Sequence, residues 1–332
     1  MSKVHPSAVP QPSAAASAGF AHQPVLVDAV LRHVPAQARL LVDATLGGGG
    51  HAAALLAAFP AAELFGADRD AVAVAAAEAR LAPHAGRILL KHAAFTELPH
   101  HLAVGSVDFL LADLGVSSPQ LDQAARGFSF TRDGPLDMRM DPQTTRRTAA
   151  ELVNQLDAEA LRDLLFRLGE ERFAARIVKA IVAARELAPI ATTGALARIV
   201  AEAVPRRFHG PHHAATRTFQ ALRMAVNEEL EQLQALLAAA PRLLAAGGRL
   251  AVIAFHSLED RAVKTTMRGW AADCTCPPHT PVCVCGKVSL GHVVTRKPIT
   301  ATAAEVADNP RSRSAKLRVF ERGAAPSAEA GP

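Results

Sequence analysis

Short apolar runs alternate with longer, alanine-rich helical stretches in the first third of the chain. The runs that we expect to be strands lie at 40–43, 63–68, 87–92 and 106–112. The run at 106–112 has an apolar centre instead of alternating with polar residues, as is typical of a parallel strand that is buried on both faces. Strands that alternate with helices in this way predict an open, doubly wound α/β sheet.

The pattern changes after about residue 120, where helical periods replace the strands. We expect helices at 157–168, 171–187, 194–204 and 216–237. A fifth strand at 249–255 then resumes the sheet, and 292–296 and 316–321 are expected to close it as an antiparallel pair. The sequence therefore predicts an all-helical domain inserted into an α/β fold.

These changes divide the chain into five parts. The predicted parts are a disordered leader (1–21), the first part of the sheet domain (22–120), a helical substrate-recognition domain (121–240), the second part of the sheet domain (241–322) and a disordered tail (323–332). The leader is rich in Ser, Pro and Ala and lacks the apolar segment of a signal peptide. No apolar run approaches the length of a membrane span, so we expect a cytoplasmic protein without a membrane partner.

The first expected strand leads directly into a glycine-rich turn. An apolar run ends at Asp43, four glycines occupy 47–50, and an alanine-rich helical run follows His51. Glycine tolerates positive φ and keeps no Cβ between the backbone and a ligand. The N–H groups at the start of the helix would suit an anionic group. The pattern also fits the loose dinucleotide fingerprint, and a turn that binds nothing is the alternative.

The acid at the end of the second strand narrows the choice of ligand. Asp68 follows Asp43 at a distance that suits an acid holding both hydroxyls of a ribose. Asp43 itself would repel a pyrophosphate but would tolerate a ligand with a positive centre. S-adenosylmethionine has a ribose, a sulfonium and an ammonium group, so it fits this charge pattern better than NAD.

Polar or aromatic side chains follow each of the four strands. They are Asp43, Asp68, Phe95 and Asp113. Ligands of open α/β sheets lie outside the carboxyl ends of the strands, so we expect these four side chains to meet in one crevice. Beyond the fourth strand, Asp113, the carbonyl of Ser118 and Gln120 offer acceptors that would orient the weakly nucleophilic lone pair of an exocyclic amine.

Several long strings, found in order, resemble the RsmH (MraW) family. They are DLGVSSPQLD at 113–122, RGFSF at 126–130, DGPLDMRM at 133–140, GEERFA at 169–174, TRTFQALR at 216–223, FHSLEDR at 255–261 and NPRSRSAKLR at 309–318. The resemblance covers roughly residues 22–322. It implies a class I S-adenosylmethionine-dependent methyltransferase with a Rossmann-like doubly wound sheet and an inserted helical domain.

The resemblance also implies an activity and a set of site residues. The family methylates N4 of a cytidine in the decoding region of bacterial 16S rRNA, within the small ribosomal subunit or its precursor. The implied cofactor-binding residues are Gly49, Gly50, His51, Asp68 (ribose), Phe95 (adenine), Asp113 and Gln120. Asp113 is also our best candidate for a catalytic residue. For Gln120 we favour the cofactor role over the amine-acceptor role, and a homodimer is left open.

The charge of the chain is compatible with an RNA partner. The formal net charge is +5, and Lys and Arg groups of this kind bind phosphates. The basic groups comprise Arg126, Arg132, Arg139, Arg146 and Arg147; Arg206, Arg207, His209, His212 and His213, near Arg217; and Arg311, Arg313, Lys316 and Arg318. A solvated or ion-paired surface is the alternative for each group. Phe128, Phe130 or Phe219 would stack on an extruded base or belong to the core.

The remaining interpretations concern the cysteines, a possible hydrolase site and the rival functions. The cysteines occur as two C-x-C pairs, Cys274 with Cys276 and Cys283 with Cys285; because zinc sites usually use C-x2-C pairs, we assign no metal and leave zinc open. His256 and Ser257 lack the G-x-S-x-G context of a hydrolase. The rival functions are an NAD-dependent oxidoreductase and a non-catalytic RNA-binding assembly factor.

Overall fold

The computed structural model describes residues 24–208, 213–277, 280 and 282–324. The expected leader and all but the first two residues of the expected tail lie outside these described residues. Within them, eight strands form one sheet in the order β3-β2-β1-β4-β5-β8-β6, with β7 paired to β8. The strands are β1 (Leu40–Asp43), β2 (Glu63–Asp68), β3 (Ile88–His92), β4 (Val107–Asp113), β5 (Leu244–Ala254), β6 (Gly291–Val293), β7 (Ile299–Thr300) and β8 (Lys316–Arg322).

The first five strands are parallel and β8 runs antiparallel to both β5 and β6. This arrangement confirms the predicted doubly wound sheet and the predicted closing pair. In β1, Leu41 is paired with Leu64 of β2 on one side and with Phe109 of β4 on the other. All three side chains are buried, which explains why these strands read as apolar runs.

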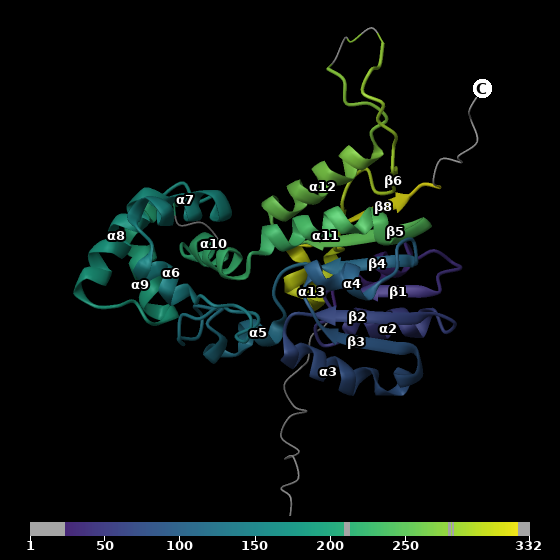
Figure 1. Ribbon diagram of the computed structural model, residues 1–332. Coiled ribbons are helices and arrows are strands. Elements are labelled where there is room, and N and C mark those ends of the chain that lie inside the picture. Colours follow the sequence, from purple (N-terminus) through teal and green to yellow (C-terminus); the bar gives the residue numbers. More distant parts are fainter. Residues whose placement is uncertain (1–23, 209–212, 278–279, 281, 325–332) are drawn as a thin grey trace, which may run out of the picture.

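Helices cover both faces of the sheet and form a separate group beside it (Figure 1). They are α1 (Val27–Leu31), α2 (Gly50–Ala58), α3 (Ala71–Leu81), α4 (Leu98–His101), α5 (Ser118–Asp122), α6 (Ala149–Gln155), α7 (Ala158–Gly169), α8 (Ala174–Leu187), α9 (Thr193–Ala203), α10 (Thr216–Asn227), α11 (Glu229–Leu243), α12 (Ser257–Ala271) and α13 (Ala303–Asp308). Side-chain caps explain several starts: Asp70 accepts from the N–H of Val72, and Asp157 accepts from that of Ala160.

The prediction of a single helix at 216–237 is wrong, because this segment forms two helices, α10 and α11, that meet at Glu228. Glu228 has a φ of +50°, a left-handed conformation that ends a helix. Tertiary contacts fix the break. The side-chain amide of Asn227 donates to the carbonyl oxygen of Met138 at 2.7 Å and accepts from the N–H of Met140 at 2.8 Å. A helical periodicity cannot register bonds to so distant a loop.

The buried apolar side chains form three clusters. One lies under α4, α11 and α12, and a second lies under α1, α2 and α3, on the opposite face of the sheet. The third joins α6 to α10 with the loop that precedes them. Leu233, Leu236 and Leu237 of α11 belong to the first cluster, so the domain boundary predicted at 240 is displaced. The helical group ends at α10, and α11 belongs to the sheet.

None of the helices in the described residues has the length and apolar character needed to cross a membrane.

Candidate functional site

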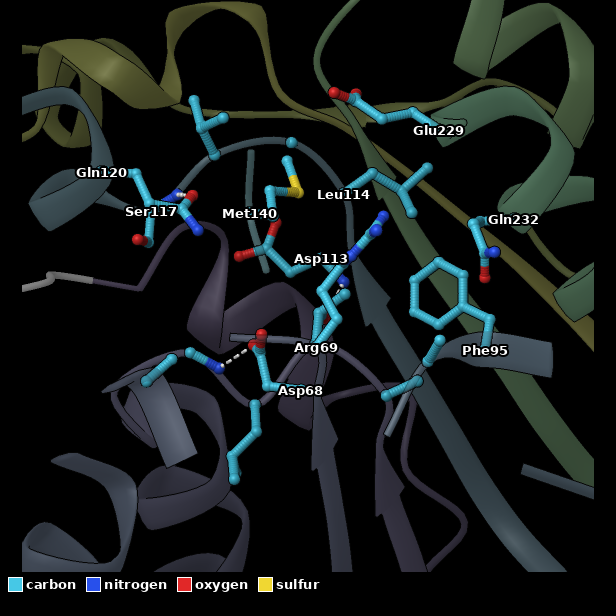
Figure 2. Close-up of a pocket in the computed structure, with 18 of the residues that line it drawn as sticks. Asp68, Arg69, Phe95, Asp113, Leu114, Ser117, Gln120, Met140, Glu229 and Gln232 are labelled. Atoms are coloured by element: carbon cyan, nitrogen blue, oxygen red, sulfur yellow. Dashed lines mark hydrogen bonds between the residues drawn. The ribbon is translucent and has the colours of Figure 1, made fainter. Parts of the chain in front are cut away.

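A pocket opens where the strand order reverses, between β1 and β4, at the carboxyl ends of the parallel strands. This is the place at which open α/β sheets bind ligands. Of the predicted site residues, the pocket is lined by Gly50, His51, Asp68, Phe95, Asp113 and Gln120. Figure 2 shows Asp68, Arg69 and Asp113 in its centre, Phe95 and Gln232 together on one side, and Ser117 and Gln120 on the other.

The glycine turn forms one wall of the pocket. Gly47 and Gly49 have positive φ, +49° and +74°, and α2 begins at Gly50 without a side-chain cap on its first turn. Gly49 lies behind the pocket surface, where a Cβ would come within 3.3 Å of the Cβ of Ala77. It therefore sets the turn, while Gly50 and His51 reach the pocket itself.

Asp68 lies at the end of β2 and connects the two turns that flank it. Its Oδ2 accepts from the N–H of Gly47 at 2.7 Å, and its Oδ1 accepts from the N–H of Asp70 at 2.9 Å. Burial raises the pKa of this carboxyl from 3.8 to about 6, against the lowering effect of these two bonds. Each oxygen keeps a second lone pair, so the carboxylate can still accept from two hydroxyl groups in the pocket.

Asp113 ends β4 close to the imidazole of His51. Oδ2 of Asp113 lies 3.6 Å from Nδ1 of His51, whose Nε2 lies 2.8 Å from the carbonyl oxygen of Val25. Oδ1 of Asp113 is buried and has no hydrogen-bond partner among the described residues. Burial raises the pKa of Asp113 well above its ordinary value, and the charges of Asp43 and Glu259 raise it further.

Asp43 does not reach the pocket surface and lies beneath it, 1 % exposed. Its Oδ1 accepts from the N–H of Thr45 at 3.2 Å. Burial raises its pKa to about 7, so the group is partly protonated near neutral pH. The expectation that four side chains meet in one crevice is thus correct for three of them, and the charge argument drawn from Asp43 loses part of its force.

Gln120 is buried and held by bonds at both ends of its amide. Nε2 donates to Oδ2 of Asp70 at 3.0 Å, and Oε1 accepts from the N–H of Ser117 at 3.0 Å. The same Asp70 oxygen receives Nη2 of Arg126 at 2.9 Å. These bonds fix the orientation of the Gln120 side chain in the pocket wall.

Several pocket residues were not anticipated from the sequence. They are Arg69, Met140, Glu229, Gln232 and Phe255. Arg69 follows Asp68 directly and connects the sheet to the helical group: Nη1 donates to the carbonyl oxygen of Asn227 at 2.6 Å, and Nη2 donates to Thr145 at 3.3 Å. Because Arg69 directly follows the acid at the end of β2, its place at the pocket could have been predicted from the sequence. Gln232 and Glu229 could not have been predicted in this way, because the packing of α11 places them at the pocket.

Glu229, His256 and Glu259 lie close enough together to suggest a metal site. Both carboxylates already have partners within the protein. Both oxygens of Glu229 receive Arg223, at 2.7 Å each. Oε1 of Glu259 lies 3.1 Å from Nε2 of His256; although burial tends to raise the pKa of Glu259, His256 and Arg223 hold it below its ordinary value. We interpret the group as an ion-pair network at the pocket rim.

The predicted basic groups divide into paired and exposed members. Arg126 is bound to Asp70, Arg139 to Asp137, Arg311 to Asp122, and both Lys316 and Arg318 to Asp260. For these residues the ion-paired alternative is correct. Arg132, Arg146, Arg147, Arg206, Arg207 and Arg313 are exposed. His209 and His212 lie outside the described residues.

The three phenylalanines considered for base stacking, and Ser257, considered for a hydrolase site, have structural roles. Phe128 and Phe219 are buried in the helical cluster, and Phe130 packs edge-on against Phe219 with ring centroids 4.9 Å apart. The core role expected for them is confirmed. The hydroxyl of Ser257 donates to Glu170, which links α12 to the helical group and leaves no nucleophile–histidine pair at this position.

Known proteins resemble this chain along most of its length. A protein from Myxococcus xanthus (strain DK1622) named "Ribosomal RNA small subunit methyltransferase H" is 54 % identical over 308 residues, which cover 91 % of this chain and 98 % of the relative. A protein of the same name from Nitratidesulfovibrio vulgaris (strain DP4) is 51 % identical over 309 residues, covering 91 % and 95 %.

The solved structure of a putative rRNA-methylase from Clostridium thermocellum matches 89 % of this chain and 94 % of its own, with 14 % identity and a TM-score of 0.39. The model of the MraW methylase family matches residues 19–323. With that match and relatives at about half identity, this chain belongs to the MraW methylase family.

Proposed function

We propose that this protein methylates N4 of a cytidine in the decoding region of 16S rRNA, with S-adenosylmethionine as the methyl donor. The observation that carries the proposal is the pair of carboxyl groups, Asp68 and Asp113, at one pocket on the switch point of the sheet. Family membership supplies the reaction class. The substrate class is that in the names of the relatives, which act on ribosomal RNA of the small subunit.

The residues of the pocket fit this cofactor. Oδ1 of Asp113 and Nε of Arg69 are buried polar atoms without a hydrogen-bond partner among the described residues, as expected of groups that await a ligand. Asp68 would accept the ribose hydroxyls and Phe95 would lie against the adenine. The N–H groups of Gly50 and His51, at the uncapped start of α2, would receive the carboxylate. When bound, the cofactor supplies an electrophilic methyl group on a sulfonium.

The protein would then have to position and polarise the attacking amine. The lone pair of a cytosine N4 amine is delocalised into the ring, so acceptors for its N–H groups favour the attack. The carboxyl of Asp113, at the end of β4, would be such an acceptor. An ionised Asp113 would also offset the positive charge that develops on the nitrogen.

Exposed cations support an RNA substrate. Arg206 and Arg207 precede Phe208, which is 43 % exposed, and the guanidinium of Arg207 lies 5.0 Å from the centre of its ring. Arg146 and Arg147 are exposed in the loop before α6. Exposed arginines bind phosphates and fix the register of an RNA, and an exposed aromatic ring offers a stacking surface for a base.

The test is transfer of a tritiated methyl group to 30S particles from a strain that lacks this protein. Digestion to nucleosides and chromatography should place the label in N4-methylcytidine. Label in another nucleoside would contradict the N4 assignment, and no label would favour a non-catalytic assembly factor. Thermal unfolding with S-adenosylmethionine or with NAD distinguishes a methyltransferase from an NAD-dependent oxidoreductase. Only the cofactor that binds the protein raises its melting temperature.

A further inference from the structure

The loop between α12 and β6 gathers all four cysteines of the chain. It projects beyond α12 and β6, away from the sheet (Figure 1). Cys274 and Cys276 lie on its outgoing arm, and Cys283 and Cys285 lie on its returning arm. The pocket and the proposed methyl transfer do not use this loop, so its cysteines need a separate explanation.

The four sulfur atoms lie at the corners of a compact group. All four Sγ atoms are within 4.8 Å of one another. The Sγ–Sγ distances are 3.4 Å between Cys274 and Cys283, 3.5 Å between Cys283 and Cys285, 3.8 Å between Cys285 and Cys274, and 3.9 Å between Cys276 and Cys283. A zinc ion binds thiolates tetrahedrally with Zn–S bonds of about 2.3 Å, so neighbouring sulfurs lie about 3.8 Å apart. Four of the six sulfur–sulfur distances, from 3.4 to 3.9 Å, lie around this value, and the other two are within 4.8 Å.

Other arrangements of sulfur fit the distances less well. A disulfide would bring two sulfurs to about 2.05 Å, and each of the four distances is far longer. A four-iron cluster would place iron and sulfide atoms between the thiolates and spread them apart. The distances suit one tetrahedrally bound ion at the centre of the group, which removes the objection that two C-x-C pairs are too tight for such a site.

The backbone around the sulfurs is arranged to support thiolates. The N–H of Thr275 donates to Sγ of Cys285 at 3.3 Å, and the N–H of Cys276 donates to Sγ of Cys274 at 3.3 Å. Gly286 follows with a φ of +59°, which turns the chain directly after the last sulfur. Thiolates are the form of cysteine that binds metal.

The described part of the loop buries little apolar surface. Its apolar side chains are exposed: Val282 at 72 %, Val284 at 83 % and Val288 at 61 %. An excursion without a buried apolar core needs a metal or a disulfide to hold its shape. Here the sulfurs of Cys274 and Cys276 on the outgoing arm lie against those of Cys283 and Cys285 on the returning arm.

We propose that Cys274, Cys276, Cys283 and Cys285 bind one structural zinc ion, which ties together the two arms of the loop between α12 and β6. With four protein ligands the ion has no open position. It therefore has a structural role, and the proposal is independent of the proposed function.

The direct test is the metal content of the untagged full-length protein, purified without chelators and measured by inductively coupled plasma mass spectrometry. We expect one zinc per chain, and at least a tenfold loss of zinc in Cys283→Ser and in Cys285→Ser. Val284→Ala is the matched control, because it changes an exposed side chain between two of the ligands; it should keep its zinc. Zinc below a tenth of an equivalent in the wild type, iron in its place, or zinc retained by both serine variants would overturn the proposal.

Two measurements on the wild-type chain keep the test valid if the serine variants fold poorly. A thiol reagent should find no reactive cysteine in the native protein and four after chelation. Cobalt exchanged into the site should give the visible absorption of tetrahedral tetrathiolate coordination. Four freely reactive thiols before chelation, two disulfides by mass spectrometry, or the absence of that absorption would each contradict the site.

Discussion

Nδ1 of His51 faces Oδ2 of Asp113 at 3.6 Å, while Nε2 of the same ring lies 2.8 Å from the carbonyl oxygen of Val25. A carbonyl oxygen only accepts, so Nε2 carries a proton and Nδ1 of a neutral ring is left as an acceptor. A protonated Asp113 complements that acceptor. The raised pKa of Asp113, caused by burial and by Asp43 and Glu259, favours this arrangement at low pH.

The first prediction concerns the pH dependence of methyl transfer. If the ionised form of Asp113 receives the N4–H, the single-turnover rate rises with pH through the raised pKa of this residue. Asp113→Asn should lower the rate by about 10²- to 10³-fold, the loss usually found for one positioned electrostatic group, and should abolish that rise. Asp163→Asn, on the exposed face of α7, is the control. A full rate in Asp113→Asn would rule out the role.

The second prediction concerns cofactor affinity. Asp68→Asn keeps an oxygen for the N–H of Gly47 but loses one charged acceptor for the ribose hydroxyls. A hydrogen bond to a charged group contributes about 1.5–3 kcal/mol, so calorimetry should show S-adenosylmethionine binding about 10- to 100-fold more weakly. Asp68→Ala should weaken binding at least as much. Unchanged affinity in both variants would contradict the ribose assignment.

The third prediction concerns stability against pH. Burial raises the pKa of Asp43 from 3.8 to about 7, so the native state binds this proton more tightly than the unfolded state. The contribution of this protonated carboxyl to the free energy of unfolding is fully present below about pH 4. It is lost as pH rises to about 7, by ~4 kcal/mol in total. Urea unfolding should show Asp43→Asn losing less stability than wild type between pH 4 and 8. Parallel curves for the two proteins would contradict the burial of a titrating carboxyl.

The fourth prediction concerns the ion pair that spans the junction of α10 and α11. Arg223 and Glu229 are joined by two bonds of 2.7 Å and are 15 % and 10 % exposed. Arg223→Met leaves a nearly buried carboxylate unpaired, which costs about 3–5 kcal/mol. The double variant Arg223→Met/Glu229→Gln should recover part of that loss in a double-mutant cycle. Additive losses would show that the two residues act independently.

The sequence predicted the parts of the fold that local pattern determines. Each parallel strand is an apolar run, and Asp68 and Asp113 stand at strand ends, so the sheet and the centre of the pocket could be inferred. The two-helix break at Glu228 could not, because it depends on Asn227 binding the loop at Met138, which lies 89 residues away in the sequence. That break brings Glu229 and Gln232 to the pocket. Because the break could not be predicted, these two pocket residues could not be predicted either.

The crystal structure of the protein with S-adenosylmethionine tests the central claim most directly. We predict density for the cofactor in the pocket between β1 and β4, with its ribose hydroxyls within hydrogen-bonding distance of Asp68, its adenine against Phe95 and its methyl group on the side of Asp113. Cofactor bound at another surface, or in this pocket with its ribose away from Asp68, would contradict the account.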